Sequence, residues 1–155
     1  MIKFITDNGL KAEIAAEILY NLTEWFGLPD STKEYIVNSG EMPFWAYYVE
    51  DKAVGFIALK QTSPSTAEIY VMGILKEYHR QGIGKVLYSA FETYAQACGY
   101  DFAQVKTVQK GRYESYDITN RFYEKLGFKE LECFPTLWDE WNPCQLYVKY
   151  IGKGI

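Results

Sequence analysis

A pair of glycines near the middle of the chain marks the residues best suited to do chemistry. Gly82-Ile83-Gly84-Lys85 follows an apolar segment, residues 66–75, whose composition is typical of a strand. Apolar residues then recur at helical spacing over residues 86–98. A glycine-rich turn that opens a helix offers backbone N–H groups to a phosphate. The sequence therefore predicts a phosphate-binding turn between a strand and a helix.

The spacing of this turn excludes two nucleotide-binding motifs. The dinucleotide fingerprint requires a third glycine at position 87, where Leu87 stands. The ATP-binding P-loop requires a glycine at position 79 and a serine or threonine at position 86, where His79 and Val86 stand. The phosphate is therefore expected to belong to another kind of ligand.

Length and charge indicate one globular domain, residues 1–155, without nucleic-acid or membrane partners. With 16 basic and 20 acidic residues the net charge is -4. This balance argues mildly against nucleic acid and anionic membranes, because both attract basic patches. The longest apolar run, residues 53–59, is too short to span a bilayer.

Cysteine and histidine content argues against disulfides and metals. Cys98, Cys133 and Cys144 are odd in number and lack metal-ligand spacing, so we expect reduced thiols in a cytoplasmic protein. His79 is the only histidine, which excludes a multi-histidine site. The N-terminal residues show no secretory pattern.

Periodicity and turn residues predict the order β-α-α-β-β-β-α-β-α-β-β. The expected strands are residues 2–5, 44–50, 53–61, 66–75, 102–108, 128–134 and 145–151. The expected helices are residues 10–26, 32–38, 86–98 and a short one from Asp117 or Thr119 to Leu126, with Pro29 helping to end the first. This order favours an α/β (α+β) fold with a single mixed, mostly antiparallel central sheet of about seven strands flanked by about four helices.

Two motifs resemble those of the GNAT acetyltransferase superfamily. Residues 74–85 are similar to its acetyl-CoA motif, Arg/Gln-x-x-Gly-x-Gly/Ala after a strand, with His79 in the first position and Arg80 beside it. Residues 120–128, Asn-Arg-Phe-Tyr-Glu-Lys-Leu-Gly-Phe, resemble its late helix–strand motif. The motifs occur in the family's order, and the predicted elements match the family fold over nearly the whole chain.

The resemblance implies acetyl-CoA as cosubstrate. The turn amides and the helix N-terminus would hold the CoA pyrophosphate. The backbone of the preceding strand would bond the pantetheine arm and polarise the acetyl carbonyl. The implied cofactor-binding residues are Met72, Ile74, His79, Arg80, Gln81, Gly82, Ile83, Gly84, Lys85 and Asn120.

The resemblance also implies two catalytic residues. Tyr123 would donate a proton to the departing CoA thiolate, and Glu68 would act as general base toward the amine. The alternatives are a packed helix tyrosine at Tyr123 and a solvated edge-strand carboxylate at Glu68, with water as the base. Asn120 can bond CoA or cap its helix. If the strand is regular, residues 68, 70, 72 and 74 point to one side.

Aromatic residues flank the acceptor side in the family. Trp25 and Phe26 end the first predicted helix, and Trp138 and Trp141 lie on the loop before the last strand. Rings beside the acidic residues of this loop would suit a cationic amine. A loop packed on the core through its tryptophans is the alternative that we favour slightly.

The implied function is that of an N-acetyltransferase, an acyltransferase for groups other than aminoacyl. The acetyl group would move from acetyl-CoA to a primary amine by direct transfer in a ternary complex. The alternative is a GNAT-fold module that senses acyl-CoA without catalysis. The acceptor, a small-molecule amine or a peptide, stays open among polyamines, antibiotics, amino acids and peptide N-termini. A homodimer is common in the family.

Overall fold

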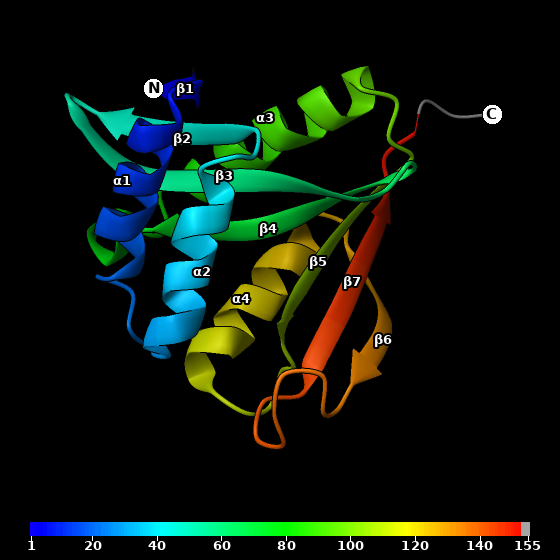
Figure 1. Ribbon diagram of the computed structural model, residues 1–155. Coiled ribbons are helices and arrows are strands. Elements are labelled where there is room, and N and C mark those ends of the chain that lie inside the picture. Colours follow the sequence, from blue (N-terminus) through cyan, green and yellow to red (C-terminus); the bar gives the residue numbers. More distant parts are fainter. Residues whose placement is uncertain (153–155) are drawn as a thin grey trace.

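Seven strands form one sheet, in the order β1-β2-β3-β4-β5-β7-β6, in the computed structural model, which describes residues 1–152 (Figure 1). The strands are β1 (Ile2–Ile5), β2 (Phe44–Val49), β3 (Lys52–Ser63), β4 (Thr66–Ile74), β5 (Phe102–Val108), β6 (Lys129–Phe134) and β7 (Cys144–Tyr150). The pair β4 and β5 is parallel, and the other neighbouring strands are antiparallel. The predicted mixed, mostly antiparallel sheet is confirmed.

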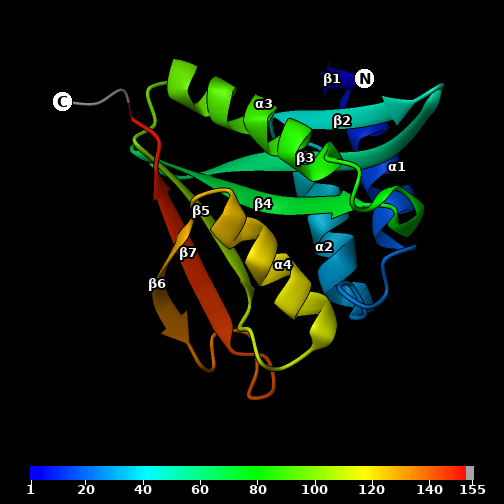
Figure 2. The same cartoon turned by 180° about the vertical axis from the view of Figure 1, so that it is seen from behind.

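Helices cover both faces of this sheet. They are α1 (Asn8–Leu19), α2 (Pro29–Ser39), α3 (Ile83–Ala97) and α4 (Glu114–Lys125), and a 3-10 turn, η1 (Lys76–Tyr78), precedes α3. Seen from behind, α3 and α4 lie in front of the sheet, while α1 and α2 lie beyond it (Figure 2). The two N-terminal helices and the two C-terminal helices therefore occupy opposite faces.

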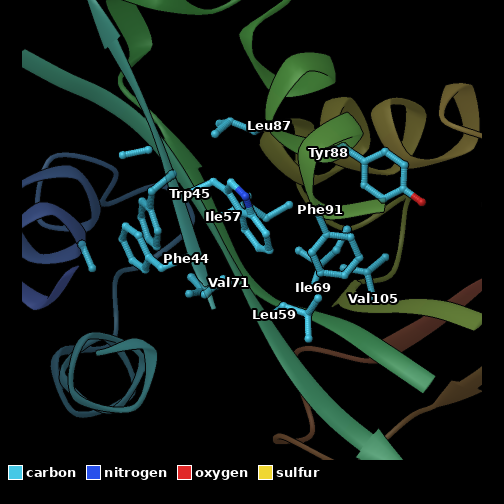
Figure 3. Close-up of a cluster of buried hydrophobic side chains, with 14 of the residues drawn as sticks. Phe44, Trp45, Ile57, Leu59, Ile69, Val71, Leu87, Tyr88, Phe91 and Val105 are labelled. Atoms are coloured by element: carbon cyan, nitrogen blue, oxygen red, sulfur yellow. The ribbon is translucent and has the colours of Figure 1, made fainter. Parts of the chain in front are cut away.

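Alternation along β2 sends its aromatic side chains into both layers of the core. Phe44 stacks on Phe56 at 5.0 Å between ring centroids, on the side of α1 and α2. The next residue, Trp45, packs against Phe91 of α3 at 6.4 Å (Figure 3). Successive strand residues point to opposite faces, so a strand that is apolar on both sides needs helices on both. Each such buried side chain stabilises the fold by about 1.5–3 kcal/mol.

Strands β4 and β5 pair over only half of their length. Their register runs from Thr66 opposite Phe102 to Ile69 opposite Val105. Both strands continue beyond this point, β4 to Ile74 and β5 to Val108. We call this region, residues 70–74 and 106–108, the splay. The other edges of these segments pair with β3 and β7, whereas the backbone groups on the two facing edges have no partner strand and are available to a ligand.

The first two helices differ from their predicted boundaries. The first helix, expected over residues 10–26, ends at Leu19. The Leu22 amide bonds the Leu19 carbonyl three residues back, at 3.0 Å, so the chain tightens and keeps Leu22 buried after the helix has ended. The expectation that Pro29 helps to end a helix is wrong, because Pro29 is the first residue of α2. At that position a missing N–H costs no hydrogen bond.

The last helix begins earlier than predicted. It starts at Glu114 rather than at Asp117 or Thr119. The preceding residue, Tyr113, provides no side-chain cap, so the start carries no capping signal in the sequence. Asp117 instead accepts a hydrogen bond from the Gly111 amide at 2.7 Å, which fixes the loop in front of the helix.

Candidate functional site

A β-bulge interrupts β4 at Tyr70, where the splay begins. In the register with β3, Leu59 pairs with Ile69 and Ala58 pairs with Val71, which leaves Tyr70 without a partner. An extra residue in one strand shifts the side to which the following side chains point. The bulge therefore divides β4 into two parts whose side chains alternate out of phase.

Glu68 and Tyr70 lie on the α2 face of the sheet, whereas Met72 and Ile74 lie on the α3 face. The Tyr70 hydroxyl accepts a hydrogen bond from Asn38 of α2 at 2.8 Å. Ile74 packs beside the first turn of α3. The expectation that residues 68, 70, 72 and 74 share one side is therefore wrong, because the bulge breaks the regular alternation on which it relied.

The free edge of β4 carries two amides that point into the splay. The Leu75 amide donates to the Val54 carbonyl of β3 at 2.9 Å. Successive amides of a strand point to opposite edges, so the amide of Ile74 points away from β3. The amide of Met72, two residues earlier, points the same way as that of Ile74. These are the two backbone positions that the sequence predicts for holding the pantetheine arm.

The turn that follows alternates between left- and right-handed backbone. Arg80 and Gly82 have positive φ, 62° and 79°, and Gln81 between them does not. Such alternation turns successive N–H groups toward one point and forms an anion-binding concavity. No side chain caps the N-terminus of α3, so its first-turn amides are without protein acceptors as well. A pyrophosphate therefore fits this turn, and the exposed Arg80 and Lys85 add positive charge beside it.

His79 connects this turn to the end of β4. Its Nε2 lies 2.6 Å from the Ile74 carbonyl oxygen. A carbonyl can only accept, so Nε2 carries the proton. The ring also meets the edge of Trp25 at 5.8 Å. Gln81 donates from its side-chain amide to the Glu77 carbonyl at 3.3 Å, which braces η1. His79 thus holds the backbone of the turn through its side chain.

Gly84 allows α3 and α4 to approach closely. A Cβ atom at this position would lie 2.9 Å from Cζ and 3.0 Å from Cε1 of Phe122, and 3.3 Å from Cδ1 of Ile74. These distances are shorter than van der Waals contact, so only glycine fits while Phe122 keeps its place. The glycine requirement here comes from packing, whereas that of Gly82 comes from its backbone conformation.

Tyr123 is buried in α4, with its ring 5.9 Å from Phe128 and 6.3 Å from Tyr147. Burial raises the pKa of Tyr123 above its ordinary value, and the nearby phenols of Tyr116 and Tyr35 add to the effect. The phenol is therefore protonated at neutral pH, as a proton donor must be.

Asn120 lies in α4, three residues before Tyr123, and is fully buried. Its side-chain nitrogen donates to the carbonyls of Val108, at 2.9 Å, and Tyr116, at 2.7 Å. Its side-chain oxygen accepts from the Tyr147 hydroxyl at 2.7 Å. Asn120 thereby ties α4 to the end of β5 and to the middle of β7, and its amide is used inside the protein.

Glu68 lies in a central strand with its side chain buried, so the reading of a solvated edge carboxylate is wrong. Its Oε1 accepts a hydrogen bond from Gln104 at 3.0 Å and lies 3.2 Å from Nζ of Lys106. Both partners come from β5, just where its pairing with β4 ends. The carboxylate is therefore held by two side chains of the neighbouring strand.

Trp25 contacts both α4 and the turn before α3. Its indole nitrogen lies 3.2 Å from the Ser115 carbonyl and 3.1 Å from Oγ1 of Thr119, both in α4. Its own carbonyl accepts from the Tyr116 hydroxyl at 2.7 Å. Since its ring also contacts His79, Trp25 links α4 to the turn before α3. Trp25 was predicted to lie at a helix end, but it lies in the connection after α1.

Two tyrosines that the sequence analysis gave no role lie beside Tyr123. Tyr35 comes from α2, with its ring 5.2 Å from that of Tyr70, and Tyr116 comes from α4. Burial raises the pKa of Tyr35 to about 12, with further contributions from Tyr70 and Glu68. Burial also raises the pKa of Tyr116, with Tyr35 as the next cause. No local pattern identifies this cluster, because its members come from opposite faces of the sheet.

The loop over residues 135–143 is shaped by Asp139, which accepts from the amides of Trp141 and Asn142 at 2.8 Å each. Trp138 is 42% exposed and Trp141 68% exposed. The expectation that these tryptophans anchor the loop on the core is therefore wrong. A hydrogen-bonded acidic side chain, rather than a buried ring, holds the loop.

Other features lie apart from the splay. An apolar hollow of about 660 Å³ is lined by residues of β1, β2 and α3, Phe4 and Trp45 among them, and by none of the predicted site residues. Among residues 1–152, no cluster of His, Cys, Asp or Glu is arranged to hold a metal, and no helix is long and apolar enough to cross a membrane. The thiols of Cys98, Cys133 and Cys144 are free.

Comparison with solved structures identifies the fold. A GNAT-family protein from Desulfovibrio desulfuricans superposes with a TM-score of 0.81 at 14% identity, covering 97% of this chain and 99% of that one. An aminoglycoside 6'-N-acetyltransferase in complex with coenzyme A gives 0.76 at 20% identity, covering 97% of each chain. The ribosomal-protein-S18-alanine N-acetyltransferase of Escherichia coli gives 0.78 at 18% identity, covering 100% and 96%. At these identities the likeness concerns the fold alone.

Comparison of sequences identifies the family. No match to a curated protein reaches significance. The family model described as an acetyltransferase (GNAT) domain matches residues 17–134, which include β4, the turn and α4. The match covers most of the chain and contains both motifs noted in the sequence. The chain therefore belongs to the GNAT acetyltransferase family.

Proposed function

We propose that this protein is an acetyl-CoA-dependent N-acetyltransferase that moves an acetyl group to a primary amine by direct transfer in a ternary complex. The observation that carries the proposal is the splay of β4 from β5, which leaves the amides along one edge of β4 free just before the anion-binding turn. The protonated phenol of Tyr123 would lie on the α4 side of this splay. Solved GNAT structures that contain coenzyme A or acetyl-CoA support the choice of cosubstrate.

The turn and the β4 edge would hold the cosubstrate. The amides of residues 80–85 would bind the pyrophosphate, with the charges of Arg80 and Lys85 beside them. His79 would fix the position of the turn relative to the end of β4 through its hydrogen bond to the Ile74 carbonyl. The amides of Met72 and Ile74 would bond the pantetheine arm in the manner of a strand added to an open edge.

The chemistry would use groups on both faces of the sheet. The Met72 amide would stabilise negative charge on the acetyl oxygen as the amine attacks the thioester carbon. Glu68, or a water molecule beside it, would take the proton from the amine. Tyr123 would give its proton to the sulfur of CoA as the carbon–sulfur bond breaks. Asn120 would serve this step by orienting α4, because its own amide is engaged by protein groups.

Thiol release and calorimetry test the proposal together. With acetyl-CoA and a panel of primary amines, we expect CoA to be released in step with acetylated amine. Titration with CoA should show one binding site per chain. Binding without thiol release for any amine would support an acyl-CoA sensor, and the absence of CoA binding would contradict the whole proposal.

A further inference from the structure

The acceptor amine would bind beside Glu68 and Tyr70, which we call the acceptor side of the splay. Charged groups of both signs lie there. Lys106 stands beside Glu68, and Nζ of Lys60 lies 5.6 Å from the ring centroid of Tyr70. Burial is the main reason that the pKa of Tyr70 is raised, and the carboxylates of Glu34 and Glu68 contribute to it. Two ammonium groups therefore accompany two carboxylates around these side chains. These four groups together carry no net charge.

This balance disfavours acceptors with several positive charges. A polyamine or aminoglycoside would bring further ammonium groups next to Lys106, which is 36% exposed and already uses Oε1 of Glu68. Like charges at such distances repel, and the one nearby buried carboxylate offers only its remaining oxygen in compensation. An acceptor with a single ammonium group avoids this repulsion.

The engagement of Glu68 also favours an amine that loses its proton easily. Gln104 and Lys106 both contact Oε1 of Glu68, so only Oε2 is left to take a proton from the amine. An α-amine has an ordinary pKa of about 7.7–8.0, whereas a lysine ε-amine has about 10.4. Near neutral pH an α-amine is therefore neutral a few hundred times more often, roughly 200–400-fold. Such an acceptor depends less on a strong base in the enzyme.

Aromatic rings form part of this side, between the charged groups. Tyr35 and Tyr70 meet edge to face, with Phe26 5.9 Å from Tyr35, and Asn38 holds the Tyr70 hydroxyl. Phenol rings combine a planar apolar surface with a hydrogen-bonding group at one end. That combination suits a peptide unit and a small side chain.

Taking the proposed N-acetyltransferase activity as its basis, we infer that the acceptor is the α-amine of a peptide. Lysine ε-amines, polyamines and aminoglycosides are then poor acceptors. The selecting features are the Lys106–Glu68 pair and the uncharged rings.

Three acceptor probes differ in the type and number of their amino groups. Alanyl-alanine amide carries one α-amine, Nα-acetyl-lysine amide carries one ε-amine, and spermidine carries several alkylamines. At about pH 7.5 we expect kcat/KM for the dipeptide amide to exceed that for either other probe by about tenfold or more. The advantage over the ε-amine should shrink by up to about tenfold per pH unit between about pH 8 and 9.5, as that amine loses its proton.

A charge-removing variant tests the role of the ion pair. Lys106→Met should raise the ratio of spermidine to dipeptide kcat/KM by about threefold or more, because one repelling charge is gone. Lys3→Met is the matched control, since Lys3 lies on β1 over Tyr48, at the opposite edge of the sheet, and should leave the ratio unchanged.

The outcomes distinguish this inference from the proposed function. A wild-type preference for spermidine or the ε-amine, or a dipeptide advantage below about tenfold, overturns the inference while acetyl transfer stands. An unchanged ratio in Lys106→Met removes the ion pair from the explanation and overturns it as stated. CoA binding without transfer to any of the three probes or to a wider amine panel contradicts the proposed function itself.

Discussion

The indole nitrogen of Trp25 lies 3.1 Å from Oγ1 of Thr119, so the connection after α1 is tied to α4. The same ring contacts His79, whose Nε2 holds the carbonyl of Ile74. Asn120 of α4 holds the end of β5 in turn, so the two strands that separate beyond Ile69 are connected indirectly through Trp25. The geometry of the splay therefore depends on a residue outside both family motifs.

Loss of the indole N–H should loosen this connection. Trp25→Phe keeps a ring beside His79 but removes the donor to Ser115 and Thr119, so we expect a loss of about 0.5–1.5 kcal/mol in unfolding free energy. Denaturant unfolding measures it, and calorimetry should show weaker CoA binding. Combined with Thr119→Val, the two losses should be less than additive.

Trp141→Phe is the control for this series, because Trp141 is exposed and its ring makes no such contact. Its stability and CoA affinity should match the wild type. Strict additivity of Trp25→Phe and Thr119→Val would show that the two side chains are not coupled.

Removal of the Tyr123 hydroxyl should slow the chemical step. For Tyr123→Phe we expect kcat to fall by about tenfold or more, while the Kd of CoA changes little, because the ring is retained. Steady-state thiol release and calorimetry measure the two quantities. Tyr150→Phe, on an exposed side chain, is the control. An unchanged kcat would remove Tyr123 from the mechanism.

Replacement of either glycine of the turn by alanine should destabilise the protein, but for a different reason at each position. Gly84→Ala places a Cβ against Phe122, and we expect a loss of about 1–3 kcal/mol and weaker CoA binding. Replacing Phe122 by Leu in the same chain should recover part of the stability. Gly82→Ala meets no neighbouring atom but must adopt a positive φ, at a cost of about 1 kcal/mol.

Phe122→Leu should therefore not rescue Gly82→Ala, which makes that double variant the control. Thermal or denaturant unfolding of the four variants provides the comparison. Equal rescue in both backgrounds would contradict the assignment of the Gly84 requirement to packing.

Truncation of Asn120 should destabilise the C-terminal half of the fold. Asn120→Ala removes the side-chain bonds to the carbonyls of Val108 and Tyr116 and leaves the Tyr147 hydroxyl only its longer contact with Glu124, at a cost of about 2–4 kcal/mol. Asn21→Ala removes a comparable bond to the Glu17 carbonyl on an exposed helix end and should cost much less. Urea midpoints at constant m-value measure the difference, and equal losses would contradict the network.

Stability should fall in alkaline solution partly through Tyr35. Its pKa is raised from 10.0 to about 12 in the folded protein, so the unfolded chain loses this proton first. The stabilisation is full below about pH 10 and is lost as the pH rises from there to about 12, with a limiting slope of about 1.4 kcal/mol per pH unit for one proton. Tyr35→Phe should make the alkaline decline shallower in urea unfolding, whereas Tyr20→Phe, on an exposed side chain, should not.

The local patterns of this chain were sufficient for the element order and for the turn. Apolar alternation and helical spacing mark β4 and α3, and the glycines between them mark the anion site, because each signal lies within a few neighbouring residues. The motif around Tyr123 likewise lies on one helix. These features predicted the family, and the fold confirmed the sheet that they require.

Tertiary structure decided how the site is assembled. The bulge at Tyr70 arises from a register with β3 and turned Glu68 away from the face of Met72, which no count along β4 could reveal. The pairing of Glu68 with Lys106 joins strands that are separated in sequence by α3. Trp25 meets Thr119 only after the sheet has brought their segments together. A single sequence records local preferences, and long-range contacts of this kind form only when the whole chain packs.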